Sequence, residues 1–361
     1  MMRNTVTTLL AASVLAMPTL AGAQAPRAQG RGTQVQPPPR VAIERQRERT
    51  RVEQRDNRAE QTERLTHTFT IGGSGELLVT NLAGDITITR GGRNEVQVEA
   101  IKTARARTEA LAREALPGVR VEFTERAGRA EVRAIHPTRQ VERGNQRSGV
   151  SVSVAYNITA PEGTRVSAKS MSGSIRITGI KGEVSASSLS GHVGIFDASR
   201  VASATSMSGD VEVGDLRAET AVELSSTSGN VTIRQSRMPR LELSSISGNV
   251  VVENVQVDRA RAQTVSGDVH FMVPLARGGR YNLSSLSGDV RVAVMGGGGF
   301  ELDAHSTSGT VHSEFAVEER TSGASAPSRG GRIRRLRGSH GDGSALLDIT
   351  TFSGSVTITK K

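Results

Sequence analysis

The chain has no cysteine and no tryptophan, and its 361 residues include only two tyrosines and seven phenylalanines. The lack of cysteine excludes both disulfide bonds and lipid attachment to an N-terminal cysteine. The scarcity of aromatic rings argues against a surface that binds sugars or single-stranded nucleic acid by stacking. The core must therefore be built almost entirely from aliphatic side chains.

Residues 1–23 have the three parts of a secretory signal peptide. Arg3 supplies the positive charge, Thr5 to Leu20 form an apolar stretch, and Ala21, Gly22 and Ala23 form a small-residue cleavage site. No later segment is long and apolar enough to span a bilayer as a helix. We therefore expect a secreted protein without a transmembrane segment after cleavage, located in the periplasm or outside the cell.

The chain is strongly basic, with a formal net charge of +10 and a pI near 10.9. A net charge of this sign favours anionic partners. Export excludes intracellular nucleic acid, so the expected partners are an anionic envelope polymer, lipid headgroups or another envelope protein. The sequence contains no motif for a cofactor or a metal ion, and none is expected.

A short frame around the dipeptide Ser-Gly repeats nine times in the second half of the chain. Its glycines are Gly173, Gly191, Gly209, Gly229, Gly248, Gly267, Gly288, Gly309 and Gly354. They are 18 to 21 residues apart, except for a last step of 45. A fixed period of this length is typical of solenoids, in which each repeat buries its apolar face against its neighbours.

Positions counted from this glycine fall into columns of similar residues. Positions −7, −5, +2 and +4 are mostly aliphatic, as in Val222, Leu224, Val231 and Ile233 around Gly229. Position −3 is always serine or threonine, and position −1 is always serine. Alternating apolar residues on both sides of a glycine predict two short strands that meet at a turn, where glycine permits a positive φ. The −3 hydroxyls are expected to be packed and hydrogen-bonded rather than reactive.

The repeat resembles the bacterial putative-adhesin domain family, a domain of unknown function found in exported and cell-envelope proteins. The segments that carry the resemblance are Val222 to Ile233, Leu283 to Val292 and the ending Gly341 to Ile358. It covers about residues 66–361 and implies a parallel β-solenoid fold. No catalytic or binding residues come with it.

These patterns predict an all-β chain, a single-stranded parallel β-solenoid of about ten rungs, with an N-terminal cap that contains one short helix. The first rung is a weaker copy around Gly84. The predicted segments are a signal peptide at 1–23, a disordered charged linker at 24–65, a β cap at 66–165 with a helix at 102–116, and the regular solenoid at 166–361 with a basic loop inserted at 321–343.

The inserted loop is the candidate binding site. Five arginines lie within nine residues, and guanidinium groups bind phosphate and carboxylate well. They are Arg329, Arg332, Arg334, Arg335 and Arg337. The residue after each repeat glycine is often Asp or Asn, and we expect these side chains to cap their own turns rather than to bind a cation.

The expected function is that of an exported, non-catalytic binding module or scaffold similar to an adhesin. The alternative is a carbohydrate-active β-helix enzyme that acts on acidic polysaccharide through a pair of carboxyl groups. Asp210 and Glu212 share one rung, but the sequence assigns no facing pair. Ser339, His340 and Asp342 have the residue types of a hydrolytic triad but lie too close in sequence to form one. No catalytic residue is therefore predicted.

Overall fold

The structure is a computed structural model that describes residues 59–136, 149–319 and 334–361. Within these residues the strands form two sheets, sheet A with 13 strands and sheet B with 14. Sheet A runs in the order β1 (Ala59–Thr70), β4 (Glu95–Ala106), β7 (Ser151–Ala160), β3 (Ile86–Arg90), β9 (Ile175–Thr178), β11 (Val193–Phe196), β13 (Val211–Gly214), β15 (Val231–Arg234), β17 (Val250–Glu253), β19 (Val269–Pro274), β21 (Val290–Met295), β27 (Val356–Lys360) and β23 (Val311–Ser313).

Sheet B follows the same direction along the stack. Its order is β5 (Arg120–Arg126), β6 (Arg129–Ile135), β2 (Glu76–Ala83), β8 (Arg165–Ser172), β10 (Glu183–Ser190), β12 (Arg200–Ser206), β14 (Val222–Ser226), β16 (Arg237–Ser245), β18 (Gln256–Ser266), β20 (Arg280–Ser287), β26 (Ala345–Ser353), β22 (Phe300–Ser306), β25 (Arg335–His340) and β24 (Glu318–Glu319).

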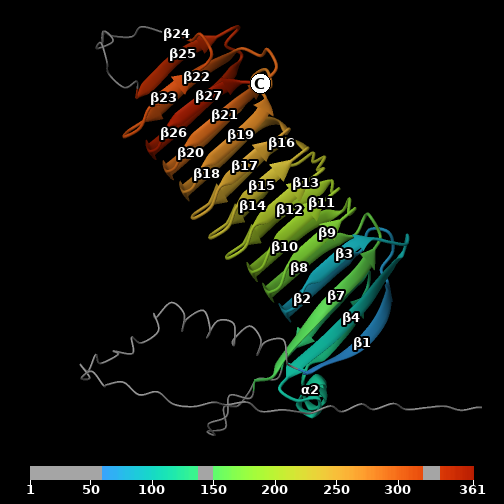
Figure 1. Cartoon of the computed structure of the whole chain (residues 1–361). Coiled ribbons are helices and arrows are strands. Elements are labelled where there is room, and N and C mark those ends of the chain that lie inside the picture. The colour runs from blue at the N-terminus through green and yellow to red at the C-terminus, as the bar shows by residue number, and fades with distance from the viewer. Residues whose placement is uncertain (1–58, 137–148, 320–333) are drawn as a thin grey trace, which may run out of the picture. The chain divides into compact units, whose positions relative to one another are not determined.

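Each repeat contributes one strand to each sheet, and equivalent strands of successive repeats pair in parallel (Figure 1). Equivalent residues are in register: Val193 lies beside Val211 in sheet A, and Ala186 lies beside Ala204 in sheet B. The predicted parallel β-solenoid is confirmed. Gly84 and the nine Ser-Gly glycines mark its rungs.

The core is the space between the two sheets, filled by the aliphatic columns. Val222 and Leu224 from sheet B and Val231 and Ile233 from sheet A are all fully buried. Period-two alternation places these residues on the inner face of each strand and the intervening polar residues outside. One cluster of buried residues extends from Phe69 to Ile358.

The repeat glycines are required for a reason that differs from the predicted one. Gly229 has no positive φ, yet a Cβ atom there would overlap the carbonyl oxygen of Gly209 in the preceding rung. The same overlap recurs at every Ser-Gly glycine. The predicted positive φ occurs at only two of the nine, Gly173 and Gly288, at 155° and 158°. All nine share the close approach of two backbones, and this is what requires glycine.

Left-handed backbone occurs instead at the turn that follows the sheet A strand, six residues after the glycine. There Asp197, Asp215, Gln235 and Asn254 have φ between 49° and 55°. Asp and Asn tolerate this conformation better than most other non-glycine residues. In these four rungs the second corner is thus formed by a different residue type from the first.

The −3 hydroxyls form the predicted ladder, and their partner is the glycine backbone. The Oγ of Ser226 donates to the carbonyl oxygen of Gly209 at 2.8 Å, and Thr264 donates to that of Gly248 at 2.9 Å. Ser170 is the exception because Asn81 Nδ2 donates to the carbonyl oxygen of Gly84 in its place. Each hydroxyl thereby satisfies a carbonyl group at the corner where two rungs meet.

The N-terminal end departs from two predictions. The segment predicted as linker at 24–65 contributes β1 from Ala59 onward, while 1–58 lie outside the described residues. The helix predicted at 102–116 is shorter: α2 spans Glu109–Ala115 and a 3₁₀ turn spans Leu116–Gly118. Residues 102–106 belong to β4, because that strand buries alternate residues between β1 and β7, and Thr108 then caps the helix.

The C-terminal end also differs from the order of the sequence. The rung of Gly354 is not the last: β26 and β27 lie between the rung of Gly288 and the rung of Gly309. Part of the predicted loop at 321–343 is a strand, β25, which pairs antiparallel with β22. An antiparallel partner at this edge covers backbone groups that would otherwise be open to pairing with another chain.

The close approach of the glycines predicts a large effect of one added methyl group. We expect Gly229→Ala to lower the free energy of unfolding by about 2–4 kcal/mol, since two backbones must separate. Gly297→Ala is the matched control, because nothing lies within 4 Å of a Cβ there. Urea denaturation of the two variants measures the difference, and equal midpoints would contradict this account of the corner.

Candidate functional site

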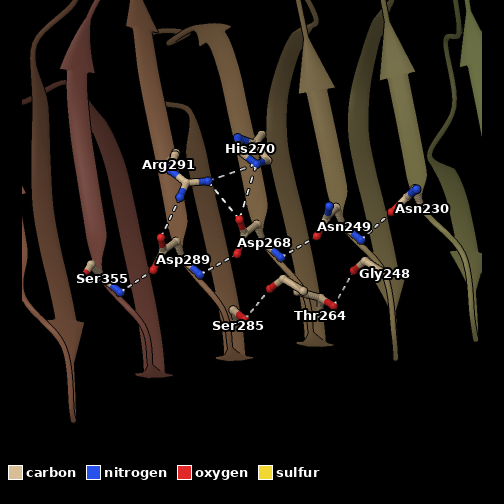
Figure 2. Close-up of polar contacts among 11 residues, drawn as sticks. Asn230, Gly248, Asn249, Thr264, Asp268, His270, Ser285, Asp289, Arg291 and Ser355 are labelled. Carbon is tan, nitrogen blue, oxygen red and sulfur yellow. Dashed lines mark hydrogen bonds and ion pairs between the residues drawn. The ribbon is translucent and has the colours of Figure 1, made fainter. Parts of the chain in front are cut away.

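The residues that follow the repeat glycines form a second ladder at the Ser-Gly corner, directly before the strands of sheet A (Figure 2). The side-chain oxygen of Asn230 accepts from the backbone N–H of Asn249 at 2.9 Å, and Asn249 accepts from Asp268 at 2.8 Å. Asp268 and Asp289 continue the ladder to Ser355. The prediction that each side chain caps its own turn is wrong: each one bonds to the neighbouring rung.

Arg291 binds two carboxylates of this ladder. Its Nη1 lies 2.9 Å from Asp268 Oδ2, and its Nη2 lies 2.7 Å from Asp289 Oδ2. Burial alone would raise the pKa of Asp268, but hydrogen bonds from Asp289 N and Arg291, with the charges of Arg291 and His270, hold it below the usual value. Arg291 offsets one of the two negative charges, and the cluster joins adjacent rungs, so we assign it a structural role.

The predicted arginine cluster is only partly described by the structure. Arg329 and Arg332 lie outside the described residues. Arg335 and Arg337 are on β25 and both contact Asp303, at 3.0 and 3.8 Å. Two of the five guanidinium groups therefore already have a carboxylate beside them. Arg334 lies immediately before β25.

The residues considered for catalysis are separated or engaged elsewhere. Glu212 pairs with Arg234, and Asp210 accepts from the backbone of Asn230. The Nδ1 atom of His340 lies 3.0 Å from the carbonyl oxygen of Ala316, and Asp342 accepts from the backbone of Ser344. Among the described residues there is no group of three or more His, Asp or Glu side chains placed to hold a metal ion, and no helix long and apolar enough to cross a membrane.

A shallow groove of about 420 Å³ lies on the outer surface of sheet B. It is lined by two adjacent outward columns of four rungs, positions −8 and −6. The first column contains Arg240, Arg259, Arg280 and Leu346, and the second contains Glu242, Arg261, Asn282 and Asp348. Sequence reasoning missed this groove, although stacking positions −8 and −6 would have shown the run of arginines.

A further outward column lies beside the Ser-Gly corner, at position −2. Eight of its members are large apolar residues that are more than a third exposed. They are Leu82, Met171, Leu189, Met207, Ile246, Val265, Leu286 and Phe352. We call this set the apolar corner column. The signal for it was also present in the repeat, two residues before each glycine.

A family model described as Toastrack DUF4097 matches residues 75–359. None of the curated proteins matches the chain.

Three solved structures, each 11% identical in sequence, align with 83% of the chain. One is a putative cell adhesion protein from Clostridium sporogenes, 100% of which is covered, with a TM-score of 0.22. The others are putative adhesins from Bacteroides fragilis, with a TM-score of 0.37, and from Parabacteroides distasonis, with a TM-score of 0.36. Each of these two is covered over 97% of its length.

The ladder of Figure 2 predicts different effects for two substitutions of Asp268. Asp268→Ala leaves the N–H of Asp289 without its acceptor, and we expect a loss of about 1–2 kcal/mol in the free energy of unfolding. Asp268→Asn keeps an oxygen acceptor and should cost less at neutral pH. Denaturation at pH 7 compares the two, and equal losses would contradict the assigned hydrogen bond.

The charge of Asp268 has its own pH signature. A carboxyl group whose pKa is lowered in the folded state stabilises the fold above its ordinary pKa, and the effect is lost as the pH falls through the lowered value. Asp268→Asn should therefore show a smaller loss of stability on acidification than the wild type. Thermal melting between neutral and acidic pH measures this, and parallel curves would contradict it.

Proposed function

The chain belongs to the Toastrack DUF4097 family, and on this premise we propose that it is an exported, non-catalytic binding module or scaffold similar to an adhesin. One observation carries the proposal. Polar groups at the Ser-Gly corner bond to the next rung, whereas two outward stretches repeat side chains of one kind: apolar residues at position −2, and arginines at position −8 of three rungs. A repeated outward array suits attachment to an extended partner, since each rung adds a further contact.

The partner classes follow from charge and from the predicted signal peptide at 1–23. A basic exported solenoid is suited to an anionic envelope polymer, to lipid headgroups or to another envelope protein. The arginine segment Arg329, Arg332, Arg334, Arg335 and Arg337 stays a predicted contact for such a partner. Of its members, Arg334 has no side-chain partner among the described residues.

One observation favours the alternative, an enzyme that acts on acidic polysaccharide. Asp303 and Asp348 are in register on β22 and β26, and burial, together with the charge of Asp303, raises the pKa of Asp348. A raised carboxyl pKa beside a second carboxylate is a feature of glycosidase acids. Against this, Asp303 is occupied by Arg335 and Arg337.

The two functions predict opposite results with glycan substrates. We expect the purified chain to leave acidic and neutral polysaccharides intact, as measured by the size distribution of the products. Asp348→Asn is the variant that tests the alternative. Reproducible cleavage by the wild type that Asp348→Asn abolishes would show an enzyme and overturn the proposed function.

A further inference from the structure

We propose that the groove on sheet B is a binding site for an acidic polysaccharide of the uronic acid type. The inference deepens the proposed binding function and rests on it. Its main feature is the row formed by Arg240, Arg259 and Arg280, which are in register on three neighbouring strands, β16, β18 and β20. Neighbouring strands are about 4.8 Å apart, so the three charges form a line along the stack.

This row is an exception within its own column. Towards the N-terminal end, position −8 and its equivalents alternate in charge along the stack. They read Arg129, Glu76, Arg165, Glu183 and Arg200. Opposite charges on adjacent strands stabilise a sheet, and like charges directly opposite destabilise it. Within this column of the described residues, three like charges lie side by side only at the groove.

Two of the three charges of the row have no partner among the described residues. Arg240 is bound by Glu242, but Arg259 and Arg280 have no ion pair or side-chain hydrogen bond with any described residue. The residues that flank the row in the column are uncharged: Ala221 precedes Arg240, and Leu346 follows Arg280. Like charges that lie side by side lower the stability of the fold. Such a cost, when no ion pair within the protein offsets it, is typical of a functional site.

The second column of the groove identifies the class of ligand. Glu242, Asn282 and Asp348 lie beside the arginines and can accept hydrogen bonds from hydroxyl groups. A uronic acid polymer supplies carboxylates for the guanidinium groups and hydroxyls for these acceptors. A phosphodiester polymer or a phospholipid surface supplies few hydroxyl donors for these acceptors. The exposed side chain of Leu346 offers an apolar contact for the face of a sugar ring.

The test measures binding of oligogalacturonate to the full chain by calorimetry. The variant is Arg259→Gln with Arg280→Gln, and the matched control is Arg165→Gln with Arg200→Gln, which removes the same charge from the same column. We expect the groove variant to bind at least about 10-fold more weakly, because charge-assisted hydrogen bonds are lost. The control should bind within about 2-fold of the wild type. The groove variant should melt no lower than the wild type, since like charges are removed.

Three results would overturn the inference. They are the absence of binding to oligogalacturonate, equal weakening in the two double variants, and equal or tighter binding of polyphosphate or phosphatidylglycerol vesicles. None of these results touches the proposed function, which fails only if the chain cleaves a glycan. A variant with Arg334, Arg335 and Arg337 changed to serine shows how much of the affinity comes from the C-terminal arginines instead.

A second inference comes independently from the apolar corner column: we infer that this corner is where two copies of the chain associate. Its eight apolar residues are between 38% and 56% exposed and follow one corner of the stack, and a stable interface buries about 800 Å² of such surface from each partner. Thr227 interrupts the column between Met207 and Ile246, and apolar residues follow on both sides of it. An exposed apolar surface that extends over this many rungs marks an interaction site.

A second copy fits this surface in charge and in spacing. Positions −4 to −1 of the ten rungs contain a single Lys, Arg, Asp or Glu, namely Lys169. Two copies of a chain with a net charge of +10 repel each other least along such a neutral corner. Only an array with the same rung spacing matches the column along its length, and an identical stack has that spacing.

Sedimentation velocity tests the association with Met207→Ser, Ile246→Ser and Leu286→Ser combined. We expect the wild type to be dimeric at about 100 µM and the triple variant to be monomeric with an unchanged melting temperature, since the three residues are exposed. Leu111→Ser, at an exposed leucine of α2, is the control and should stay dimeric. A monomeric wild type, or a triple variant that remains dimeric, would overturn the inference.

Discussion

The close contact between successive glycines at the Ser-Gly corner is the constraint on which the rest of the structure depends. A Cβ atom at Gly229 or Gly248 would overlap the preceding glycine's carbonyl oxygen, so no other residue permits this spacing of the rungs. The same carbonyl group accepts the hydroxyl of the −3 serine or threonine. Close packing and hydrogen bonding therefore act on the same backbone group, and together they fix the register of both sheets.

The register in turn determines which side chains pack or hydrogen-bond within the fold and which remain on the surface to contact a partner. Inward columns are aliphatic and buried, and the corner columns at −3 and +1 bond to neighbouring rungs. In the remaining outward columns some side chains pair across rungs, as Arg234 does with Glu212, whereas others, such as Arg259, have no partner among the described residues. Because every rung repeats the same geometry, a residue type that recurs in the sequence becomes a linear array on the surface. The arginine row and the apolar corner column are two such arrays, on the outer surface of sheet B and at its corner.

Strand pairing differs at the ends of the stack, because an end rung has a neighbouring rung on one side only. At the N-terminal end of sheet B, β5 and β6 pair antiparallel beside β2. At the other end β24 and β25 pair antiparallel beside β22. In the stack, β26 lies between β20 and β22, and β27 lies between β21 and β23, although both follow these strands in the sequence. Ion pairs from Arg335 and Arg337 to Asp303 attach the end strand β25 to β22.

The repeat period and the inward columns by themselves determined the parallel solenoid, because burial on one face of each strand leaves a single register at each rung. They also predicted that the −3 hydroxyls are packed and hydrogen-bonded within the fold. Local pattern failed where pairing decides structure: alanines at 102–106 fit a helix, but β1 and β7 on either side hold them in a strand. Sequence order placed Gly354 last, and only the packing of the end rungs places it before Gly309.

The candidate sites were likewise determined partly by the sequence and partly by the tertiary structure. The columns at −8 and −2 are visible in the sequence, yet whether an arginine is free or paired depends on which strand lies beside it. Arg165 and Arg259 hold the same position in the repeat, but the first lies beside Glu76 and the second beside Arg240 and Arg280. The sequence thus determined the kind of residue that each rung presents, and the tertiary structure decided its neighbours, because electrostatic and apolar contacts act across rungs and not along the chain.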